Sequence, residues 1–548
     1  MSRSAFSFSA LSTPDCLAPR VVRPAPWLTR DWAILALLVL FAALLRLAFF
    51  NGFFGSDDLV YLTRSKEIAE GLWTRADYNG ALRYGYNIPA AFFIYLLGLS
   101  PFSANAWTLF CSLAEIALVY FFAARYLGRN AAVFAALILA SIPLHIALGT
   151  RIHADAVLAC FLTLSFVLFY MAEQTASRGF YFATGLSLGM IFWTKELGVI
   201  TLLAFATYPF FAGRADKAWL WVIGGGMVML VSHLVLMQAI AGDPFHLITT
   251  VTGQVRNGVV QDGYEDAAGY YFSYLLVDIR HTWIAPFLAV LALVGLLTRS
   301  KHPADGGTVF YLGWWLLALL VVLSFTPVSF SPLRLTMKQS NYLNLFLAPI
   351  ALLGGTMLAR MHSASWRNGL LIITVAGGIA LGAVAQHAYQ VFTANSKAAI
   401  DFMKAHPDAW ILGTVNNANM ARVISTLEGN PLLAQQFGTL ARASEFDASP
   451  ASRRQPLGYA ILDLETLNWG NTAFLSETPP ACWQPVVRLT PQSRDPGYWL
   501  LRTALRFSPT LPDAMGQAVK PTLLRYLAPR PATIYRVDAT NLWCKLPA

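Results

Sequence analysis

The chain has 548 residues, of which 56% are hydrophobic and only 12% are charged, and its formal net charge is +10. Soluble domains carry about 25% charged residues, so this chain has too little polar surface to coat a soluble particle of its size. The composition excludes an ordinary soluble enzyme, a disordered chain and a coiled coil, and it predicts a protein embedded in a bilayer. Because the sequence contains no basic run, and cytoplasmic loops of membrane proteins collect Lys and Arg, the positive charge requires no nucleic-acid partner.

The first long apolar segment covers residues 32–50. At about 1.5 Å per residue, a helix of this length crosses a bilayer core. No small-residue cleavage site follows it, so we expect a retained anchor and not a signal peptide. Arg20, Arg23 and Arg30 precede the segment. Because basic residues favour the cytoplasmic side, they place the N-terminal tail, residues 1–30, in the cytoplasm.

Ten further apolar segments predict that residues 31–392 form an all-α polytopic membrane domain with about eleven transmembrane helices. These segments are 105–124, 131–149, 156–172, 179–194, 197–212, 218–240, 282–298, 309–328, 342–359 and 368–388. Alternating orientation gathers short basic loops on the cytoplasmic side and most loop acids on the opposite side, as the positive-inside rule requires. The apolar stretch 88–102 is too short to span, so we expect an interfacial or re-entrant helix there.

Polar residues, prolines and turn signals become common after about residue 394, which predicts a soluble α/β domain over residues 393–548. Short strands are expected at 409–415 and 458–464, with a helix over 416–428 between them. The outward exit of the last span places this domain outside the cytoplasm. A disulfide between Cys482 and Cys544 is allowed in that compartment, although the sequence does not decide it.

Two adjacent acids, Asp57 and Asp58, lie in the first outer loop, directly beyond the membrane end of the first predicted span. Paired carboxylates at a bilayer surface suit a general base or a cation site, because both need a charged acceptor. The alternative is a solvated loop in which Asp58 caps a helix over residues 59–70. The residue pattern by itself leaves both interpretations open.

Two further charged clusters lie in outer loops of this charge-poor chain. Arg151, His153 and Asp155 share one short loop. Ionisable groups at membrane depth are costly, which favours a functional role over a polar interfacial turn. Lys195 and Glu196 occupy a very short outer turn, where they either form an ion pair or present the Lys195 ammonium to a phosphate.

A last cluster places Arg334 and Lys338 just outside a later span and Tyr342 within it. These residues either bind a ligand or anchor the helix at the membrane interface. Glu115 and His145 lie within predicted spans, where we expect buried, hydrogen-bonded groups and not catalysts.

The order of these clusters resembles the glycosyltransferase-C superfamily, and in particular its bacterial branch that is similar to protein O-mannosyltransferases and lipid A aminoarabinose transferases. The resemblance covers roughly residues 30–390 and leaves the soluble domain outside. The positions that carry it are, in chain order, Asp57-Asp58 with Tyr61, Arg83-Tyr84-Gly85 with Pro89, Arg151-x-His153-x-Asp155, Thr194-Lys195-Glu196, and Lys338-x-x-x-Tyr342 with Pro349.

This resemblance implies an inverting glycosyltransferase that moves a sugar from a polyprenyl-phosphate carrier to a hydroxyl or phosphate of a glycan, lipid or protein on the periplasmic side. It implies Asp57 as the catalytic base, with Asp58 and Asp155 as catalytic residues that support it or orient groups. Asp57 and Asp155 could also hold a divalent metal ion. The leaving phosphate needs preplaced cations. The residues expected to bind substrate are Tyr61, Arg83, Arg151, His153, Lys195, Glu196, Arg256, Lys338 and Tyr342.

The expected location is the bacterial inner membrane, and the expected partners are the lipid-linked sugar donor, the acceptor and membrane lipids.

The sequence departs from the aminoarabinose transferases at Glu196, where they have a small residue, and at Arg83-Tyr84-Gly85, where they have Lys-Pro-Pro. The sugar and the acceptor are therefore open. The alternative function is a transporter or flippase of a lipid-linked sugar, which would favour charges near the bilayer midplane and repeated halves.

Overall fold

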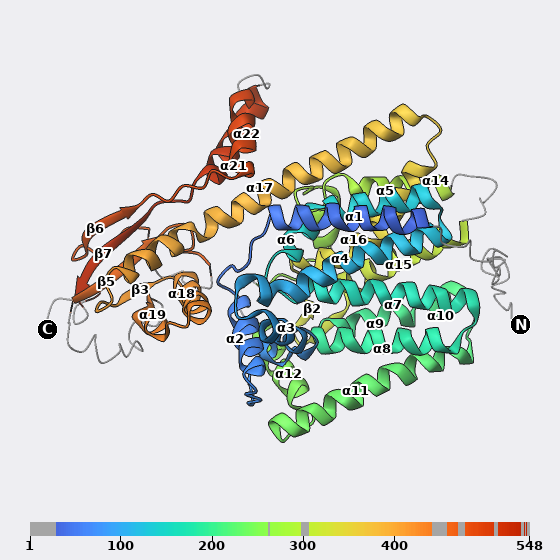
Figure 1. Ribbon diagram of the computed structural model, residues 1–548, viewed down its shortest axis with the longest axis horizontal. Coiled ribbons are helices and arrows are strands. Elements are labelled where there is room, and N and C mark those ends of the chain that lie inside the picture. The colour runs from blue at the N-terminus through green and yellow to red at the C-terminus, as the bar shows by residue number, and fades with distance from the viewer. Residues whose placement is uncertain are drawn as a thin grey trace, which may run out of the picture.

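The computed structural model describes residues 29–260, 264–297, 306–440, 457–469, 477–508 and 513–538, together with residues 542 and 544. All but the last two residues of the expected N-terminal tail, 1–30, lie outside this part of the chain. Figure 1 shows a bundle of near-parallel helices and a smaller domain with a sheet, joined by the long helix α17 (Ala364–Lys404). The expected fold class, an all-α polytopic domain followed by an α/β domain, is confirmed.

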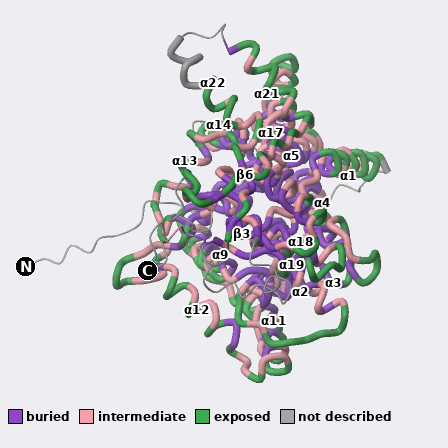
Figure 2. Tube along the Cα trace, turned by 90° about the vertical axis from the view of Figure 1, so that its left-hand side faces the viewer, coloured by how far each residue is buried: buried purple, intermediate pink, exposed green. Residues whose placement is uncertain are grey.

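Seven helices of the described residues are long and apolar enough to cross a membrane, and an eighth crossing exists if one bent pair counts as a single span. The seven are α1 (Thr29–Ala48), α4 (Pro101–Tyr126), α7 (Asp155–Thr175), η3 with α11 (Lys217–Trp219 and Leu220–Ala241), α15 (Gly306–Phe325), η4 with α16 (Ser340–Phe346 and Leu347–Ala359), and α17. The chain is therefore a multi-pass membrane protein. Figure 2 shows buried residues concentrated inside the bundle and exposed residues along its outer turns.

The other four segments expected to span are helical but bent or short. The bent pair is α5 (Arg129–Ser141) and α6 (Pro143–Gly149), which meet at 65° because Pro143 has no N–H with which to continue α5. The short segments are α8 (Arg178–Thr194), α9 with α10 (Gly198–Ala206 and Tyr208–Ala212), and α14 (Ala285–Leu297). Every expected apolar segment is thus helical, but length and composition qualify seven or eight spans and not eleven.

Short elements cover the end of the bundle that faces the C-terminal domain. They are α2 (Asp58–Ala69), η2 (Asn79–Leu82), α3 (Tyr84–Leu97), α12 (His246–Gly258), α13 (Tyr270–Leu276), β1 (Pro327–Phe330) and β2 (Leu333–Leu335). Helix α3 has 14 residues and exposes Phe92 and Tyr95, as an interfacial helix would. This helix occupies most of the stretch 88–102, where a helix too short to span was expected.

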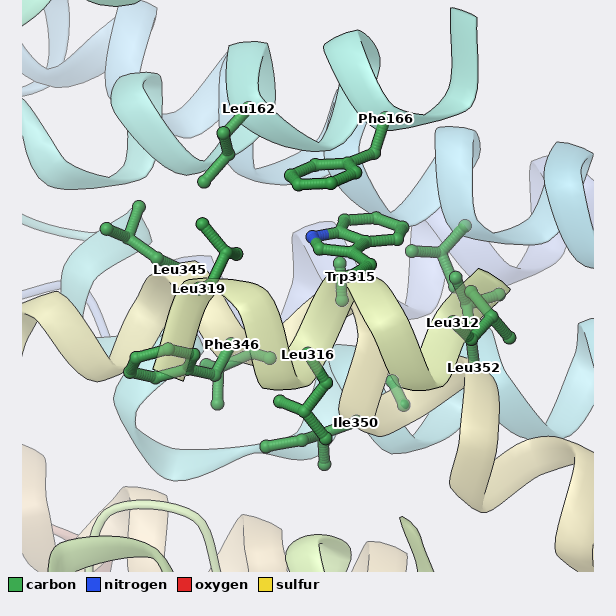
Figure 3. Close-up of a cluster of buried hydrophobic side chains, with 14 of the residues drawn as sticks. Leu162, Phe166, Leu312, Trp315, Leu316, Leu319, Leu345, Phe346, Ile350 and Leu352 are labelled. Carbon is green, nitrogen blue, oxygen red and sulfur yellow. The ribbon is translucent and has the colours of Figure 1, made fainter. Parts of the chain in front are cut away.

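Aromatic and aliphatic side chains fill the core of the bundle (Figure 3). Phe166 of α7 stacks on Trp315 of α15 with ring centroids 4.5 Å apart and an interplanar angle of 12°. Leu319 of α15 and Phe346 of η4 belong to the same fully buried cluster. This packing ties the early and late helices of the chain together.

One charged network lies inside the bundle, where α1, α4 and α6 meet. The Arg46 guanidinium lies 2.5 Å from Nδ1 of His145 and donates to Oγ of Ser112 at 2.8 Å. His145 Nε2 lies 3.2 Å from Oε2 of Glu115, whose other oxygen accepts from Thr163 at 2.8 Å. All five side chains are buried. The expectation that Glu115 and His145 are buried, hydrogen-bonded groups is confirmed.

The C-terminal domain contains a mixed five-stranded sheet in the order β4-β3-β5-β7-β6. Its strands are β3 (Ile411–Gly413), β4 (Phe437–Thr439), β5 (Leu457–Asp463), β6 (Gln484–Leu489) and β7 (Ala532–Asp538), with helices α18 (Val415–Glu428), α19 (Pro431–Gln436), α21 (Pro496–Phe507) and α22 (Asp513–Leu527). The three strands β4, β3 and β5 are parallel, whereas β7 is antiparallel to both of its neighbours. The two expected strands and the helix between them correspond to β3, β5 and α18.

Helix α17 runs without a break through the expected domain boundary at 392/393. Its last turns supply Ala399, Ile400 and Met403 to the hydrophobic core of the sheet domain. At the other end of the domain, Cys482 and Cys544 form a disulfide, with Cα atoms 5.6 Å apart. The bond that the sequence left undecided is thus present in the structure.

Helices α8 and α11 approach each other closely at a pair of glycines. A Cβ at Gly225 would overlap the carbonyl oxygen of Phe182, and one at Gly185 would overlap the carbonyl oxygen of Val222. Close backbone approach at small residues is a common way for membrane helices to associate. The contact between α8 and α11 therefore depends on the absence of side chains at these positions.

We predict that Gly225→Ala destabilises the protein by about 1–3 kcal/mol, because the new methyl group must push α8 and α11 apart. The matched control is Gly224→Ala, where the new Cβ would lie 3.9 Å from the Phe182 ring, an ordinary contact. Thermal unfolding of both variants in the same detergent measures the difference. Equal melting temperatures for the two variants would contradict the close contact.

Candidate active site

The outer clusters of the sequence meet at the end of the bundle near α2. A short parallel bridge joins the first outer loop to the next one, since the Gly52 amide donates to the Thr150 carbonyl at 2.8 Å and the Ile152 amide donates to the Gly52 carbonyl at 2.9 Å. Asp155 begins α7, Lys195 caps the end of α8, and Tyr342 lies in η4. Loops far apart in sequence thus contribute to one site.

Asp155 is the centre of the first group of contacts. Lys195 Nζ donates to its Oδ1 at 2.7 Å, Asn341 Nδ2 donates to its Oδ2 at 2.9 Å, and Nδ1 of His153 lies 2.6 Å from the same Oδ2. The Lys195 ammonium also lies 4.7 Å from the centroid of the Tyr342 ring. Lys195 therefore pairs with Asp155, which is 40 positions away, and not with the adjacent Glu196.

Glu196 belongs to a second ion pair. The Arg83 guanidinium holds both of its carboxylate oxygens, at 3.0 and 2.5 Å, and Asn79 Nδ2 donates to one of them at 3.0 Å. Arg83 also donates to the Tyr61 hydroxyl. Burial alone would raise the pKa of Glu196, but the Arg83 cation outweighs that effect and the pKa is lowered. Burial raises the pKa of Tyr61, so its phenol is protonated and available as a hydrogen-bond partner.

The two adjacent acids have different surroundings. Asp58 is buried and accepts from the backbone N–H groups of Phe54 and Gly55, at 2.6 and 3.0 Å, and from that of Ser56. Its carboxylate therefore holds the turn that precedes α2. Asp57 is half-buried, and its side chain makes no capping bond to α2.

Among the residues that the structure describes, the Asp57 carboxylate has one hydrogen-bond contact, a long one from the Tyr78 hydroxyl at 3.3 Å. Burial together with this carboxylate raises the pKa of Tyr78 to about 12. The phenol therefore remains protonated at neutral pH and can donate. Because a single long hydrogen bond leaves most of its lone pairs available, Asp57 is the acid of this pair that can accept a proton from a ligand.

Arg151 is a cation with unused hydrogen-bonding capacity. Its guanidinium packs 5.0 Å from the centroid of the Tyr389 ring, and its buried Nε has no partner among the described residues. Burial lowers the pKa of Arg151, although the carboxylates of Asp155, Asp58 and Asp57 partly offset this effect. Such a group is suited to an anionic ligand.

The last two expected cations lie apart from these contacts. Lys338 is buried, donates to the Thr336 carbonyl at 2.6 Å and lies 6.0 Å from the Tyr271 ring centroid. Burial lowers the pKa of Lys338 to about 8, against the opposing effect of Asp266 and Glu265. Arg256 is exposed in the last turn of α12, and no contact of the described residues joins it to Asp155 or Asp57.

Four residues of the site carried no signal that singled them out in the sequence. Asn341 lies inside the expected Lys338–Tyr342 stretch, so its position was marked although its role was not. Tyr78 and Asn79 lie in an ordinary loop, and Tyr389 lies on a helix far along the chain. Only the folded arrangement reveals these contacts.

The expected metal ligands do not form a metal site in this arrangement. Asp155 already has three partners on its two oxygens, and the side-chain contact that the described residues give Asp57 is a tyrosine hydroxyl. Within the described residues, no group of three or more His, Cys, Asp or Glu side chains is placed to hold a metal ion.

An apolar cavity of about 750 Å³ extends from this site between α8, α9, α11 and α12. Glu196 is the charged member of its lining, and the other members are mostly aliphatic or aromatic. They include Leu188, Phe192, Val199, Leu230 and Val251. The cavity can therefore hold a hydrocarbon chain whose polar end lies near Glu196 and its partner Arg83.

Comparison with known families gives a match to the model for dolichyl-phosphate-mannose-protein mannosyltransferase over residues 86–237. The resemblance to this group of glycosyltransferases is confirmed over that segment, which includes Arg151, Asp155 and Lys195. No curated protein matches the chain.

Solved structures of similar shape include ArnT from Cupriavidus metallidurans. Its apo form is 16% identical with a TM-score of 0.48, covering 83% of this chain and 96% of that one. Its form bound to undecaprenyl phosphate is 16% identical with a TM-score of 0.49, covering 86% and 97%. An oligosaccharyltransferase from Archaeoglobus fulgidus is 12% identical with a TM-score of 0.48, covering 80% of this chain and 69% of that one.

We predict that Lys195→Met destabilises the protein by roughly 3 kcal/mol, because it leaves the Asp155 carboxylate buried beside a neutral side chain. Adding Asp155→Asn should restore much of the loss, since the unpaired charge is then removed. The control is Arg75→Met, which breaks the exposed Arg75–Asp77 pair and should change stability by at most about 0.5 kcal/mol. Thermal unfolding in detergent measures all three; additive losses in the double variant would contradict the pairing.

Proposed function

We propose that this protein is an inverting glycosyltransferase that moves a sugar from a polyprenyl-phosphate carrier to a hydroxyl group of a glycan, lipid or protein. The observation that carries the proposal is the combination of an apolar cavity, buried cations at its polar end, and the available carboxylate of Asp57. A lipid-linked sugar phosphate has the matching parts, which are a hydrocarbon tail, an anionic link and a sugar.

The donor would lie with its lipid tail in the apolar cavity and its phosphate at the Glu196 end. Arg83 and Lys195 are the nearest cations of that end, and both are already oriented by buried carboxylates. Arg151 supplies a further cation, and its Nε has no hydrogen-bond partner among the described residues. Cations fixed before the reaction stabilise the charge that grows on the leaving phosphate without having to reorganise.

The reaction then requires one proton acceptor. Asp57 would take the proton of the acceptor hydroxyl while the hydroxyl oxygen attacks the anomeric carbon from the face opposite the phosphate. The bond from oxygen to the anomeric carbon forms, the bond from that carbon to the phosphate oxygen breaks, and polyprenyl phosphate leaves with the electron pair. Asp58 and Asp155 would act as positioning residues, because backbone amides, Lys195, His153 and Asn341 occupy their oxygens.

The site would lie on the periplasmic side of a bacterial inner membrane, with the N-terminus in the cytoplasm. Two observations support this orientation. Basic residues gather in the loops of the opposite side. The Cys482–Cys544 disulfide belongs to the domain on the side of the site, and disulfides persist in oxidising compartments.

The buried charges inside the bundle give little support to the alternative function, a transporter or flippase. The network of Arg46, His145 and Glu115 does lie inside the bundle, but its members are fully buried and bonded to one another. A transport path needs charged groups that line a water-filled route. The network instead fixes α1, α4 and α6 to one another.

We predict that Asp57→Asn lowers turnover by about 10² or more, because the amide keeps the shape of the side chain but cannot take a proton. Purified protein would be supplied with lipid-linked sugars of several kinds, which also identifies the donor. Asp77→Asn is the matched control, since Asp77 is an exposed acid of the same outer loop. Normal turnover by a folded Asp57→Asn protein would exclude Asp57 as the base.

The orientation predicts opposite labelling of two exposed positions. In a variant with Cys16→Ser, Leu432→Cys should react in intact cells with a maleimide that reaches the periplasm but cannot cross the inner membrane. Trp366→Cys should react only after the membrane is opened. Leu432 and Trp366 are 66% and 75% exposed, and the free cysteines Cys111 and Cys160 are buried. The reverse pattern would place the site in the cytoplasm.

A further inference from the structure

The turn that carries Asp57 is held by the C-terminal domain. Helix α18 lies beside α2 in Figure 1, and its first turn faces residues 54–55. Asn416 Nδ2 donates to the Phe54 carbonyl at 2.9 Å and to the Gly55 carbonyl at 3.4 Å, and Asn419 Nδ2 donates to the Gly55 carbonyl at 3.3 Å. These amides satisfy carbonyl groups that belong to the membrane domain.

The fit between the turn and α18 depends on shape as well as on hydrogen bonds. Gly55 has a φ of +81°, a left-handed conformation that favours glycine. A Cβ at this position would lie 2.6 Å from Cγ of Met420 and 2.9 Å from Nδ2 of Asn416. The turn therefore has no room to shift toward α18.

The opposite edge of the turn is held by the membrane domain itself. The N–H groups of Phe54 and Gly55 donate to Asp58, while their carbonyl groups accept from α18. The Phe54 ring stacks on Phe392 of α17 at 4.5 Å, with an interplanar angle of 12°. Contacts on both edges and on the Phe54 side chain thus restrain the backbone that leads into Asp57.

Asn416 is itself anchored inside the C-terminal domain. Ser396 Oγ donates to Oδ1 of Asn416 at 3.0 Å and accepts from Nδ2 of Asn417 at 2.8 Å. The same Asn417 amide donates to Oδ2 of Asp463 at 3.0 Å, at the end of β5. All four side chains are buried. A chain of buried hydrogen bonds thus connects the sheet to the turn, and the orientation of the Asn416 amide is set by it.

We propose that Asn416 is a positioning residue of the active site, and that the C-terminal domain completes the site by fixing the turn before Asp57. This inference rests on the proposed role of Asp57 as the base. Without the two carbonyl bonds, the turn gains freedom and the carboxylate spends less time where it can reach an acceptor hydroxyl. Proton transfer should therefore become slower, whereas donor binding should not change, because the donor cavity lies elsewhere, between α8, α9, α11 and α12.

The test compares Asn416→Leu, which removes the amide at similar volume, with Thr426→Val on the same helix. Thr426 is half-buried, and within the described residues its hydroxyl bonds only to the Arg422 carbonyl of its own helix. We expect Asn416→Leu to lower kcat by 10- to 100-fold, to leave donor affinity within twofold, and to speed hydrogen exchange at the amides of Phe54 to Ser56 by at least tenfold. Thr426→Val should change none of these quantities.

A general folding defect would also lower activity, so the decisive measurement is made in the Asp57→Asn background. If Asn416 acts through Asp57, Asn416→Leu should lower turnover little further once the Asp57 carboxylate is gone. A smaller folded fraction would instead lower turnover by the same factor in both backgrounds. Equal factors in the two backgrounds, or unchanged kcat in Asn416→Leu, would overturn the proposal. If Asp57→Asn is fully active while exchange is still faster in Asn416→Leu, the base assignment fails and only the clamp on the turn stands.

Discussion

A charged group that leaves water needs a partner of opposite charge, and this requirement shapes the outer end of the helix bundle. Asp155 with Lys195 ties the start of α7 to the end of α8, and Arg83 with Glu196 ties the start of α3 to the same place. Each pair joins segments that hydrophobic packing alone would allow to slide, because lipid offers no preference between apolar surfaces. The second pair also reaches toward Asp57, because Glu196 accepts from Asn79, the neighbour of the Tyr78 whose hydroxyl contacts Asp57.

Pairing also separates the charged groups by role. Asp58, Asp155 and Glu196 have partners for both oxygens, so they hold loops and cations in place. Asp57 and Arg151 retain hydrogen-bonding capacity, and they lie where the first two outer loops meet. A site of this kind orders most of its charges in advance and leaves one carboxylate and one guanidinium able to bind a ligand.

The sequence predicted those features that depend on a short stretch of residues, such as apolar helices and charged loops. Hydropathy located the apolar helices of the membrane domain but not the outer helices α12 and α13, and charge in an apolar chain marked the outer clusters. The ion-pair partners of these charged residues were not predictable from the sequence. Lys195 pairs with Asp155 of another helix, and the adjacent Glu196 pairs with Arg83. Hydropathy does not report helix length or bends, so α8, α9 with α10, and α14 are shorter than the sequence pattern suggested, and α5 and α6 meet at a bend. Arg256 was expected in the site because of its charge alone, and the fold leaves it exposed.

Helix α17 crosses the membrane and then enters the core of the C-terminal domain as one continuous element of 41 residues. Each residue of an α-helix turns the chain by about 100° and advances it by about 1.5 Å. The helical phase of α17 therefore decides which face of the sheet domain meets the membrane domain. A single residue inserted or deleted between the two domains would rotate α18 away from Gly55, so the length of this helix helps to determine the geometry of the candidate site.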